Sequence, residues 1–575
     1  MYTTKIDISH IPFSRYGANL ALSAKPANEE RTEFNELYIH HAKLRSDGNT
    51  MFILKVGLGE PQNFTCEAEP DAVTIKTADG SAKFYIKDDE TLIIDSDGLD
   101  LRIDARYKWI YGTEYGPDMF RFIMIPYNLQ PTYKVLTGKG TILRKPDEKR
   151  IAKQDMAFEC VDGKLHVCLT LSIKEPKDIP EDIDTEKDTA EIRKEWNEFA
   201  ELMEDLKSVD EQTDNFTRLT WYNLWSSFVS ADGIYKRDTM LMSKKNMNSV
   251  WSWDHCFNAL AMARSKDKAF AKQKAFDQFM APFVLQTEKG VLPDMWNPDC
   301  EIRWGTTKPP IHGWCFSKLM DMFEFDEEEL KTVYTWLKKW TEWWTIYSDS
   351  DRDGIPDYPQ GCDSGWDNST LFDASYYVET PDLPAFLIFQ MNTLSRIAKE
   401  LKDEENAKYW EDEAKAMLDR LIEHSWNGER FVGKISISHE HEENPTSLLS
   451  MMPLVLGDML PKEISDKLVA VLERDFLTEN GLATEMPTSQ HYNPDGYWRG
   501  PIWAPSTYLL VDGLRKGGYT ELAETVAKRY CDMSCLKAKG NYENFDALTG
   551  KGWRAPGYTW SASVYMLLRG EYDKK

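Results

Sequence analysis

Two different hydrophobic periods divide the chain near residue 175. Before this point apolar and polar residues alternate with a period of two, which is typical of strands that bury one face. Pairs such as Asp79-Gly80 and Asp97-Gly98 separate these segments and favour tight turns. The alternation predicts an antiparallel β-sandwich over 1–175. The clearest strands are expected at 72–77, 82–87 and 165–171.

A polar stretch over 174–188 with two prolines has the composition of a linker. After about residue 190 apolar side chains recur every three to four positions, as they do in helices. We therefore expect a linker and connecting helix over 176–213, followed by a helical domain over 214–575. Helices are predicted at 191–207, 214–229, 253–264, 266–286, 311–325, 327–348, 381–401, 404–424, 446–456, 461–474, 500–516, 519–533 and 558–569.

The predicted helices are of two kinds. The segment 446–456 is apolar on nearly all sides and is expected to be buried, whereas 404–418 has a polar face and is expected to lie outside. Buried helices that alternate with amphipathic ones predict an (α/α)6 toroid, in which six inner helices are surrounded by six outer ones. The expected fold class is therefore mainly α, with an N-terminal β-sandwich before the toroid.

Composition and charge exclude several classes of protein. Hydrophobic residues make up 42% of the 575 residues, a value that suits a globular chain. The formal net charge of −26, with no basic patch, argues against nucleic acids and anionic membranes as partners. The N-terminus has no signal-peptide pattern, no apolar run reaches ~18–20 residues, and the nine cysteines form no Cys-x-x-Cys pair. We expect a cytoplasmic protein.

Tryptophan is frequent and unevenly placed. Of the 20 tryptophans, only Trp109 precedes Trp196. The excess has two interpretations: an aromatic helical core, or a cavity whose indole faces stack on the C–H faces of sugar rings. The tryptophans between 336 and 344 repeat at helical spacing and are expected in the core. Four long segments between helices are expected to carry function because loops of this length are uncommon, namely 287–310, 349–380, 475–499 and 534–557.

The loop sequence GCDSGWDNST at 361–370 places Asp367 directly after Trp366. A general acid has to keep its proton near neutral pH, and a carboxyl group against indole surfaces meets that need. The alternative is an Asx-type turn in which Asp367 caps the segment that follows.

A second loop, NYENFDALTGKGWRAPG at 541–557, contains Glu543, Asp546 and Trp553. Two carboxyl groups from distant loops are the minimum for glycosidic bond hydrolysis, one as the acid and the other as base or nucleophile. Glu543 is the preferred second carboxylate, and Asp546 and Glu485 remain alternatives. A solvated loop carboxylate is the simpler interpretation.

Three further motifs carry residues that suit a sugar site. Asp254, beside Trp253, either caps a helix or binds sugar hydroxyls. Lys308 precedes two prolines and is either a hydroxyl ligand or a surface lysine. The segment YWRGPIW at 497–503 is either cation–π packing at a helix start or part of a binding surface, and it contains Trp498, Arg499 and Trp503.

The acidic segment DSDRDGIPD at 349–357 resembles the first half of a calcium-binding loop. Its alternating carboxylates could point to one centre, although the bidentate glutamate at position 12 is missing. A structural Ca²⁺ ion and a plain acidic turn are both consistent with this segment. The candidate metal ligands are Asp349, Asp351, Asp353 and Asp357.

Six motifs in this order resemble glycoside hydrolase family 63, the processing α-glucosidases and their bacterial relatives, with trehalases as a related group. They are WSWD at 251–254, TKPPIHGW at 307–314, SGWDNS at 364–369, DLPAF at 382–386, YWRGPIW at 497–503 and ENFDALTG at 543–550. The chain departs from the family pattern at Thr370-Leu371 and at Ala547, both near the expected cavity mouth.

The resemblance implies an inverting, exo-acting α-glucosidase with an (α/α)6 barrel, in which Asp367 is the general acid and Glu543 the general base. It further implies that Trp253, Asp254 and Lys308 hold the nonreducing sugar. Trp366, Trp498, Arg499, Trp503 and Trp553 are expected nearby. No cofactor is expected for catalysis, and a small carbohydrate is the expected partner. A trehalase or an amylo-1,6-glucosidase type of hydrolase is an alternative within the same class.

A sugar epimerase or isomerase on the same toroid is the main alternative from another class. Such enzymes use pairs of histidines as acid and base, and only His255 and His312 lie within the motifs above. A phosphorylase would need a basic phosphate cradle, and a lectin would have no use for paired carboxyl groups.

Overall fold

The computed structural model describes residues 4–44, 48–106, 110–124, 129–144, 154–172, 179, 183–206, 209–299 and 301–572. Trp109 and residues 174–178 and 180–182 of the predicted linker lie outside the described residues. The chain divides into two compact units. One comprises Met1–Met203, Thr217–Ser249 and Asn297–Glu301, and the other Glu204–Phe216, Val250–Trp296 and Ile302–Lys575.

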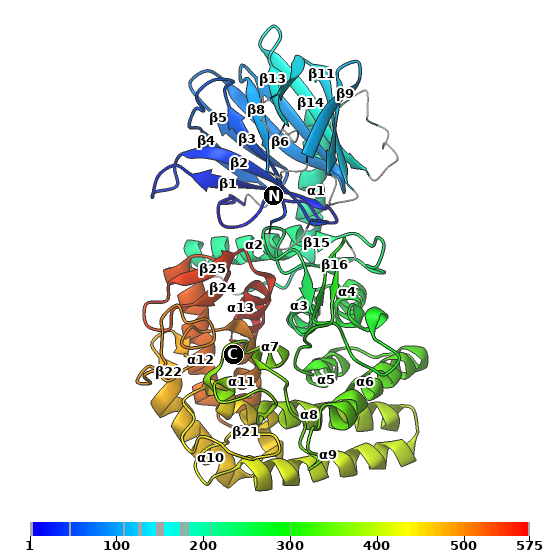
Figure 1. Cartoon of the computed structure of the whole chain (residues 1–575), viewed down its shortest axis with the longest axis vertical. Helices are drawn as coiled ribbons and strands as arrows, with labels where there is room; N and C mark the ends of the chain where they lie inside the picture. Colours follow the sequence, from blue (N-terminus) through cyan, green and yellow to red (C-terminus); the bar gives the residue numbers. More distant parts are fainter. Residues whose placement is uncertain are drawn as a thin grey trace. The chain divides into compact units, whose positions relative to one another are not determined.

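The first unit contains two antiparallel sheets, so the predicted antiparallel β domain is confirmed (Figure 1). One sheet has the order β1-β2-β3-β8-β13-β12 and the other β4-β5-β6-β7-β14-β11-β10-β9. The strands are β1 Leu20–Pro26, β2 Phe34–His41, β3 Thr50–Val56, β4 Thr65–Glu69, β5 Ala72–Lys76, β6 Ser81–Asp88, β7 Thr91–Asp97, β8 Leu101–Ala105, β9 Ile110–Gly116, β10 Met119–Met124, β11 Gln130–Thr137, β12 Lys139–Arg144, β13 Gln154–Glu159 and β14 Lys164–Ser172.

The two sheets pack face to face through aromatic side chains. Phe52 and Phe158, from the first sheet, contact Tyr133 of the second with ring centroids 5.6 Å and 5.4 Å away. Phe122 contacts both Phe52 and Tyr133. Because strand side chains alternate between faces, these buried residues are the apolar positions that produced the period of two.

Each predicted helical segment contains a helix in the structure. The helices are α1 Thr185–Leu202, α2 Glu211–Ser226, α3 Asp254–Met262, α4 Lys268–Met280, α5 His312–Met322, α6 Glu327–Tyr347, α7 Gly361–Ser364, α8 Asp382–Glu400, α9 Glu404–Ser425, α10 Lys462–Val471, α11 Ala504–Lys516, α12 Thr520–Asp532 and α13 Thr559–Tyr572. The segment predicted at 446–456 is a 3-10 helix, η3 Leu448–Met459. Pro453 lacks the N–H that an α-helix would need there, and Gly457 adopts a φ of 62° near its end.

Six elements of the second unit form a closed series of contacts (Figure 1). In order, α3 contacts α5, α5 contacts α8, α8 contacts η3, η3 contacts α11, α11 contacts α13, and α13 contacts α3. All nine residues of α3 are buried, as are the first eleven of α11. The helices α6, α9 and α10 each contact one of these six, whereas α4 and α12 contact two. The helices α6, α9, α10 and α12 bury one face only, and α4 is buried on all sides over its last turns.

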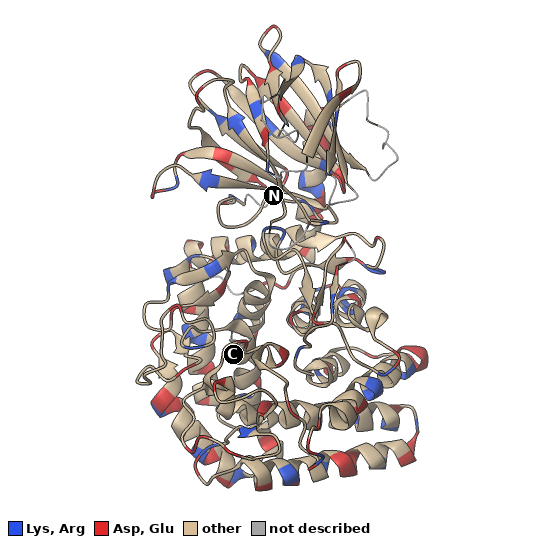
Figure 2. Ribbon diagram, viewed as in Figure 1, with Lys and Arg blue, Asp and Glu red and all other residues tan. Residues whose placement is uncertain are grey.

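The amphipathic helices of the second unit carry their charge on the exposed face. Acidic and basic residues are interspersed along α9 (Figure 2), and Lys408 pairs with Asp412 one turn later. At the start of α6, Asp326 and Glu329 form a reciprocal capping box with each other's backbone N–H groups. None of the described helices combines the length and the hydropathy that a bilayer span requires.

Three short two-stranded pairings support the loops of the second unit. They are β20 Val378–Glu379 with β21 Lys434–Ile435, β22 Leu477–Thr478 with β23 Gly481–Leu482, and β24 Tyr542–Phe545 with β25 Gly552–Pro556. The third pairing contains Glu543, and the first lies at the end of the loop that contains Asp367.

Candidate active site

Glycines shape the loop that carries Asp367. Gly365 ends the short helix α7 with a φ of 72°, a backbone conformation that favours glycine. A Cβ atom at this position would lie 2.7 Å from Cζ2 of Trp253, and one at Gly361 would lie 2.4 Å from the Asp367 carbonyl oxygen. The loop therefore packs against the Trp253 ring more closely than any larger residue would allow.

The Asp367 carboxyl group is enclosed and keeps its proton more readily than a free aspartic acid. Burial raises the pKa of Asp367, and the charge of Asp294 raises it further. The ammonium group of Lys308 and a hydrogen bond from Tyr497 act in the opposite direction. A carboxyl group with a raised pKa can act as a general acid, because it stays protonated at higher pH than a free carboxyl group.

Glu543 lies on β24, whose pairing with β25 fixes its backbone. Its side chain is buried, and burial raises the pKa of Glu543 to about 7. The Arg554 guanidinium and a hydrogen bond from Tyr497 lower this pKa, whereas the charge of Asp367 raises it. Asp367 and Glu543 therefore interact electrostatically, and the protonation of one depends on that of the other.

Tyr497 connects the two carboxyl groups. Its hydroxyl lowers the pKa of both Asp367 and Glu543, and burial raises the pKa of the phenol far above its usual range. The hydroxyl has one proton, so it donates to one carboxylate at a time. The Arg554 guanidinium lies over the Tyr497 ring, 4.7 Å from its centroid. Tyr497 lies within one of the six sequence motifs, but nothing in that motif predicts this role.

Four of the tryptophans expected at the site form one group. Trp498 stacks on Trp503 with ring centroids 4.0 Å apart and an angle of 7° between the planes. Trp366 lies 4.6 Å from Trp498, and Trp253 lies 6.3 Å from it. Trp560, which the motifs did not indicate, contacts both Trp253 and Trp503. Trp366 precedes Asp367 in the chain, and Trp560 Nε1 donates to the Glu543 carbonyl at 3.2 Å, so this group lies next to both carboxylate-bearing segments.

Asp254 and Lys308 lie in the same buried region. Asp254 is the first residue of α3, its Oδ2 atom has no hydrogen-bond partner among the described residues, and burial raises its pKa well above the usual value. The Lys308 Nζ atom lies 3.0 Å from Asp294 Oδ1 and donates to the Cys362 carbonyl at 2.6 Å. Asp294 lies in none of the six sequence motifs, and the only feature that could have indicated it is its position within a long loop.

The remaining expected site residues have other contacts. Arg499 donates to the Asn368 carbonyl at 2.7 Å and pairs with Asp373, so it clamps the loop next to Asp367. Trp553 lies on β25 with the Lys551 ammonium 4.1 Å from its ring.

The carboxylates of Asp546 and Glu485, the alternative bases, both accept hydrogen bonds from backbone or side-chain donors. Asp546 accepts from the N–H groups of Leu548 and Thr549 at 2.8 Å and 3.1 Å. Glu485 accepts from the hydroxyl of Thr370 at 3.0 Å and from that of Thr446. These contacts are those of turn and loop supports.

His255 and His312 form a satisfied hydrogen-bond chain. Trp340 Nε1 donates to His312 Nδ1 at 3.2 Å, and the Nε2 atoms of the two imidazoles are 3.2 Å apart. Nδ1 of His255 lies 3.0 Å from the Gln278 carbonyl, to which it donates. Burial lowers the pKa of His255 to about 3 and that of His312 well below its usual value. Both imidazoles are therefore neutral at pH 7, unlike the acid of an epimerase pair.

Three of the four predicted metal ligands lie together. Asp349, Asp351 and Asp353 each offer a carboxylate oxygen within 4.8 Å of the others. Asp357 is outside this group: it is buried, and its Oδ2 atom accepts from the Ser350 N–H at 3.0 Å. Burial raises the pKa of Asp349 and of Asp357.

A comparison with protein families identifies the family of the chain. Residues 247–561, more than half of the chain, match the model described as the mannosylglycerate hydrolase MGH1-like glycoside hydrolase domain. The chain belongs to this glycoside hydrolase family. The match includes every residue discussed above at the carboxyl pair, from Trp253 to Trp560.

Curated relatives of this family are similar over parts of their length. The mannosylglycerate hydrolase of Rubrobacter radiotolerans is 21% identical over 417 residues, which are 55% of this chain and 89% of the relative. That of Thermus thermophilus is 35% identical over 82 residues, so the match spans only 14% of this chain and 19% of the relative. A periplasmic trehalase from Xanthomonas axonopodis is 25% identical over 239 residues, 38% of this chain and 41% of the trehalase.

Solved structures show the fold. A bacterial glucoamylase in complex with acarbose covers all of this chain and 96% of its own, with a TM-score of 0.61 and 11% identity. A family 63 mannosylglycerate hydrolase from Thermus thermophilus, in complex with Tris and D-glycerate, covers 62% of this chain and 98% of its own. Its TM-score is 0.51 at 18% identity.

Proposed function

We propose that the chain is an inverting, exo-acting glycoside hydrolase that cleaves an α-linked glucoside or a small oligosaccharide. The pair of Asp367 and Glu543 is the observation that supports this proposal, because both carboxyl groups have a raised pKa, the charge of Asp367 acts on Glu543, and the Tyr497 hydroxyl acts on both. The pair lies within the matched family domain, and a pair of carboxyl groups is what glycosidic hydrolysis requires.

In the proposed reaction Asp367 begins protonated and Glu543 ionised. Asp367 transfers its proton to the glycosidic oxygen as the bond between that oxygen and the anomeric carbon breaks. Glu543 removes a proton from a water molecule whose oxygen bonds to the anomeric carbon from the opposite face. The released sugar therefore has β configuration. Asp367 ends ionised and Glu543 protonated, and solvent restores both groups.

We further propose that the second unit is an (α/α)6 toroid. The closed series of contacts through α3, α5, α8, η3, α11 and α13 supplies the six inner elements. The one-sided burial of α6, α9, α10 and α12 supports an outer layer. The 3-10 element η3 takes an inner position because its residues from Leu448 to Gly457 are all buried.

The buried polar groups suit the hydroxyls of one terminal sugar. Asp254 has a free acceptor atom, Oδ2, among the described residues, and Lys308 is a charged donor held by Asp294. The Trp253 ring lies between this region and the other indoles. Hydroxyl groups paired with charged side chains give geometric selectivity among hexoses, because a misplaced hydroxyl leaves a buried charge unpaired.

The family supports a second substrate, an α-mannoside of glycerate. Several of its curated relatives are mannosylglycerate hydrolases, and solved complexes of the Thermus thermophilus relative contain glucose or D-glycerate. Glucosides and mannosides differ only in the configuration at C2, so the two candidates use the same carboxyl chemistry.

Proton NMR of the first product separates these proposals. The purified chain is incubated with trehalose, glucosylglycerate, maltotriose, sucrose and mannosylglycerate, and the anomeric signals are followed before mutarotation. The expected first product is the β anomer of the glycone from one member of this panel. Initial release of the glycone as the α anomer would contradict inversion; for trehalose, whose second glucose leaves as the α anomer, inversion gives α- and β-glucose in equal amounts. An altered sugar in an intact glycoside would favour an epimerase.

Two variants test the residue roles. Asp367→Asn and Glu543→Gln should each reduce turnover by at least about a thousandfold with an unchanged circular dichroism spectrum. Asp321→Asn, an exposed carboxylate on α5 that pairs with Arg396, is the matched control and should retain activity. Full activity in Asp367→Asn would exclude Asp367 as the acid.

A further inference from the structure

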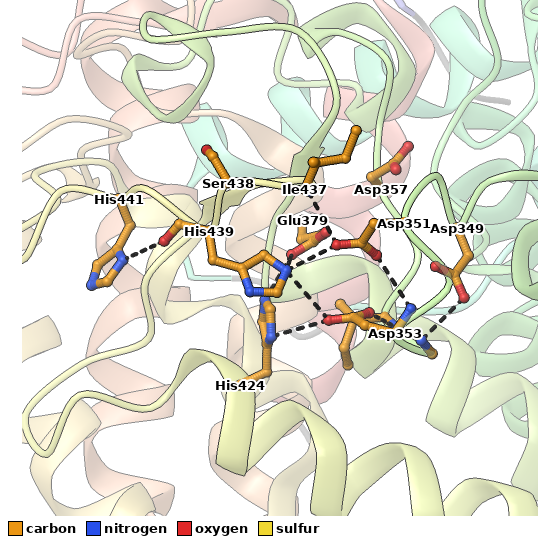
Figure 3. Close-up of polar contacts among 12 residues, drawn as sticks. Asp349, Asp351, Asp353, Asp357, Glu379, His424, Ile437, Ser438, His439 and His441 are labelled. Carbon is orange, nitrogen blue, oxygen red and sulfur yellow. Dashed lines mark hydrogen bonds and ion pairs between the residues drawn. The ribbon is translucent and has the colours of Figure 1, made fainter.

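Four potential metal ligands meet away from the carboxyl pair. Asp353 follows α6, Glu379 lies on β20, His424 is in the last turn of α9, and His439 follows β21 (Figure 3). Each offers one nitrogen or oxygen atom, and these atoms all lie within 4.8 Å of one another. None of the four has a role in the proposed hydrolysis.

Glu379 is the most informative member of this cluster. It is 1% exposed, and neither of its carboxylate oxygens has a hydrogen-bond partner among the described residues. His424 Nε2 lies 2.7 Å from Glu379 Oε2, but the imidazole nitrogen is also without a hydrogen bond in the described part of the chain, because its direction is wrong for one. The His255–His312 chain, by contrast, has a consistent partner for each nitrogen.

A buried carboxylate with no donor is costly unless a cation neutralises it. Lone pairs of a carboxylate and an imidazole that approach without a hydrogen bond are the arrangement that a shared metal ion produces. The surroundings are mostly acidic as well, because Asp349, Asp351 and Asp357 are close by (Figure 3). One positive group, the guanidinium of Arg420, lies next to Gly354.

The distances match a four-coordinate site. A tetrahedral zinc ion with bonds of about 2.0–2.1 Å places its ligand atoms about 3.3 Å apart. Here His439 Nε2 is 3.7 Å from Asp353 Oδ2 and 3.9 Å from Glu379 Oε2. His424 faces Asp353 through Nδ1 at 3.4 Å and Glu379 through Nε2 at 2.7 Å, and one of these two nitrogens would bind the ion. Asp351 Oδ2 lies 2.9 Å from His439 Nε2 and also accepts from the Ile437 N–H, so it borders the cluster.

We propose that Asp353, Glu379, His424 and His439 bind one divalent transition-metal ion of the zinc class. Two imidazoles and two carboxylates favour such an ion over Ca²⁺, which takes oxygen ligands only. The oxygen-only set of Asp349, Asp351 and Asp353 is a different proposal, because it contains no nitrogen ligand.

The ion closes the base of the loop that contains Asp367. Asp353 lies before Asp367 in the sequence and Glu379 after it, and Tyr358 pairs with Val378 between the same two points. His424 and His439 connect this loop base to α9 and to the segment after β21. A bound metal ion therefore holds four chain segments together, and its removal loosens the loop without removing a group that contacts substrate.

The test uses the full chain, purified and stripped of metal with a chelator that is then removed. Zn²⁺, Co²⁺ and Ca²⁺ are added separately, and stoichiometry is measured by elemental analysis and calorimetry. We expect one Zn²⁺ per chain, a visible Co²⁺ absorption band typical of nitrogen and oxygen ligation, and a higher Tm with Zn²⁺ than with Ca²⁺.

His424→Gln and His439→Gln should each weaken Zn²⁺ binding at least about a hundredfold, because one of four ligands is lost. His441→Gln is the matched control, since His441 contacts Glu443 and the His439 carbonyl and lies outside the cluster (Figure 3). It should bind Zn²⁺ like the unaltered chain. His439 is 40% exposed, so His439→Gln remains informative even if the more buried His424 variant fails to fold.

Three results would overturn the proposal. They are the absence of stoichiometric Zn²⁺ binding, Zn²⁺ binding that both histidine variants retain, and stabilisation by Ca²⁺ alone that neither variant alters. Because the readouts are metal content, absorption and Tm, they are independent of whether the proposed glycosidase activity is found.

Discussion

The ammonium group of Lys308 lies 3.0 Å from the carboxylate of Asp294, and both side chains are buried beside Asp367. Asp294 and Asp367 raise the pKa of Lys308 despite its burial, so the lysine stays charged. The positive charge of Lys308 lowers the pKa of Asp367, and the negative charge of Asp294 raises it. This ion pair therefore sets how firmly the proposed acid holds its proton.

Asp294→Asn should move the alkaline limb of the kcat profile to lower pH. The substitution removes a charge that raises the pKa of Asp367 and leaves the lowering effect of Lys308, so the acid loses its proton earlier. The measurement is kcat against pH for both proteins. An alkaline limb that stays in place would show that Asp294 does not influence the acid, and Asp321→Asn controls for general effects of losing a carboxylate.

The kcat/KM profile of the unaltered protein should have an acid limb near pH 7. Burial raises the pKa of Glu543 to about 7, and a base has to be ionised, so activity falls as pH drops through that value. Asp367 sets the alkaline limb, because the acid must still be protonated. An acid limb near pH 4.5, the usual value for a glutamic acid, would mean that Glu543 is not the base, or that it is exposed to water.

Tyr497→Phe should lower kcat by about ten- to a hundredfold while the protein stays folded. The hydroxyl lowers the pKa of Asp367 and of Glu543, so its loss should also move the acid limb to higher pH. Tyr519→Phe is the control, because the Tyr519 hydroxyl donates to Asp466 on the exposed side of the helical unit. An unshifted acid limb would indicate that Tyr497 only fills space.

Asp512→Ala should reduce the free energy of unfolding by about 3–5 kcal/mol. Asp512 on α11 accepts from Trp314 Nε1 at 2.8 Å and pairs with Lys318 at 2.5 Å, both on α5. Its removal leaves the Lys318 ammonium, which is largely enclosed, with no carboxylate at that distance among the described residues. Urea unfolding followed by circular dichroism measures the loss, and Asp466→Ala, on an exposed helix face, should cost much less.

The contribution of the Asp512–Lys318 ion pair to the free energy of unfolding depends on pH. Lys318 and Lys516 hold the pKa of Asp512 below its usual value of 3.8. Its stabilising contribution is therefore complete above about pH 4 and disappears as the pH falls through the lowered pKa. The stability difference between the unaltered protein and Asp512→Ala should narrow below about pH 4, and a constant difference would contradict the ion-pair explanation.

Much of the fold could be predicted from the sequence, because burying one face of a strand or a helix makes apolar residues recur at a fixed spacing. The strands at 72–77 and 82–87 and the long helix at 327–348 all appear within a few residues of their predicted limits. The 3-10 form of η3 was not readable, since an apolar run fits any fully buried helix and the effect of Pro453 depends on its neighbours.

The candidate site was readable only where chemistry coincides with a local motif. Asp367 and Glu543 stood out because tryptophan and glycine surround them in the sequence. Asp294 and Tyr497 act through partners far away in the chain, and a single sequence carries no sign of such pairing. The same holds for Glu379 and His439, whose significance depends on four segments that converge in space.

The contact between α3 and α13 also determines when the helical unit can finish folding. The first and last members of the closed series are separated by roughly 300 residues, so at ~5–20 residues per second a ribosome adds α13 about 15–60 s after α3. During that interval one side of α3, all of which is buried in the finished fold, has no partner. During synthesis an apolar surface of α3 is therefore exposed for a time, and binding of chaperones to the nascent chain should fall once α13 has emerged.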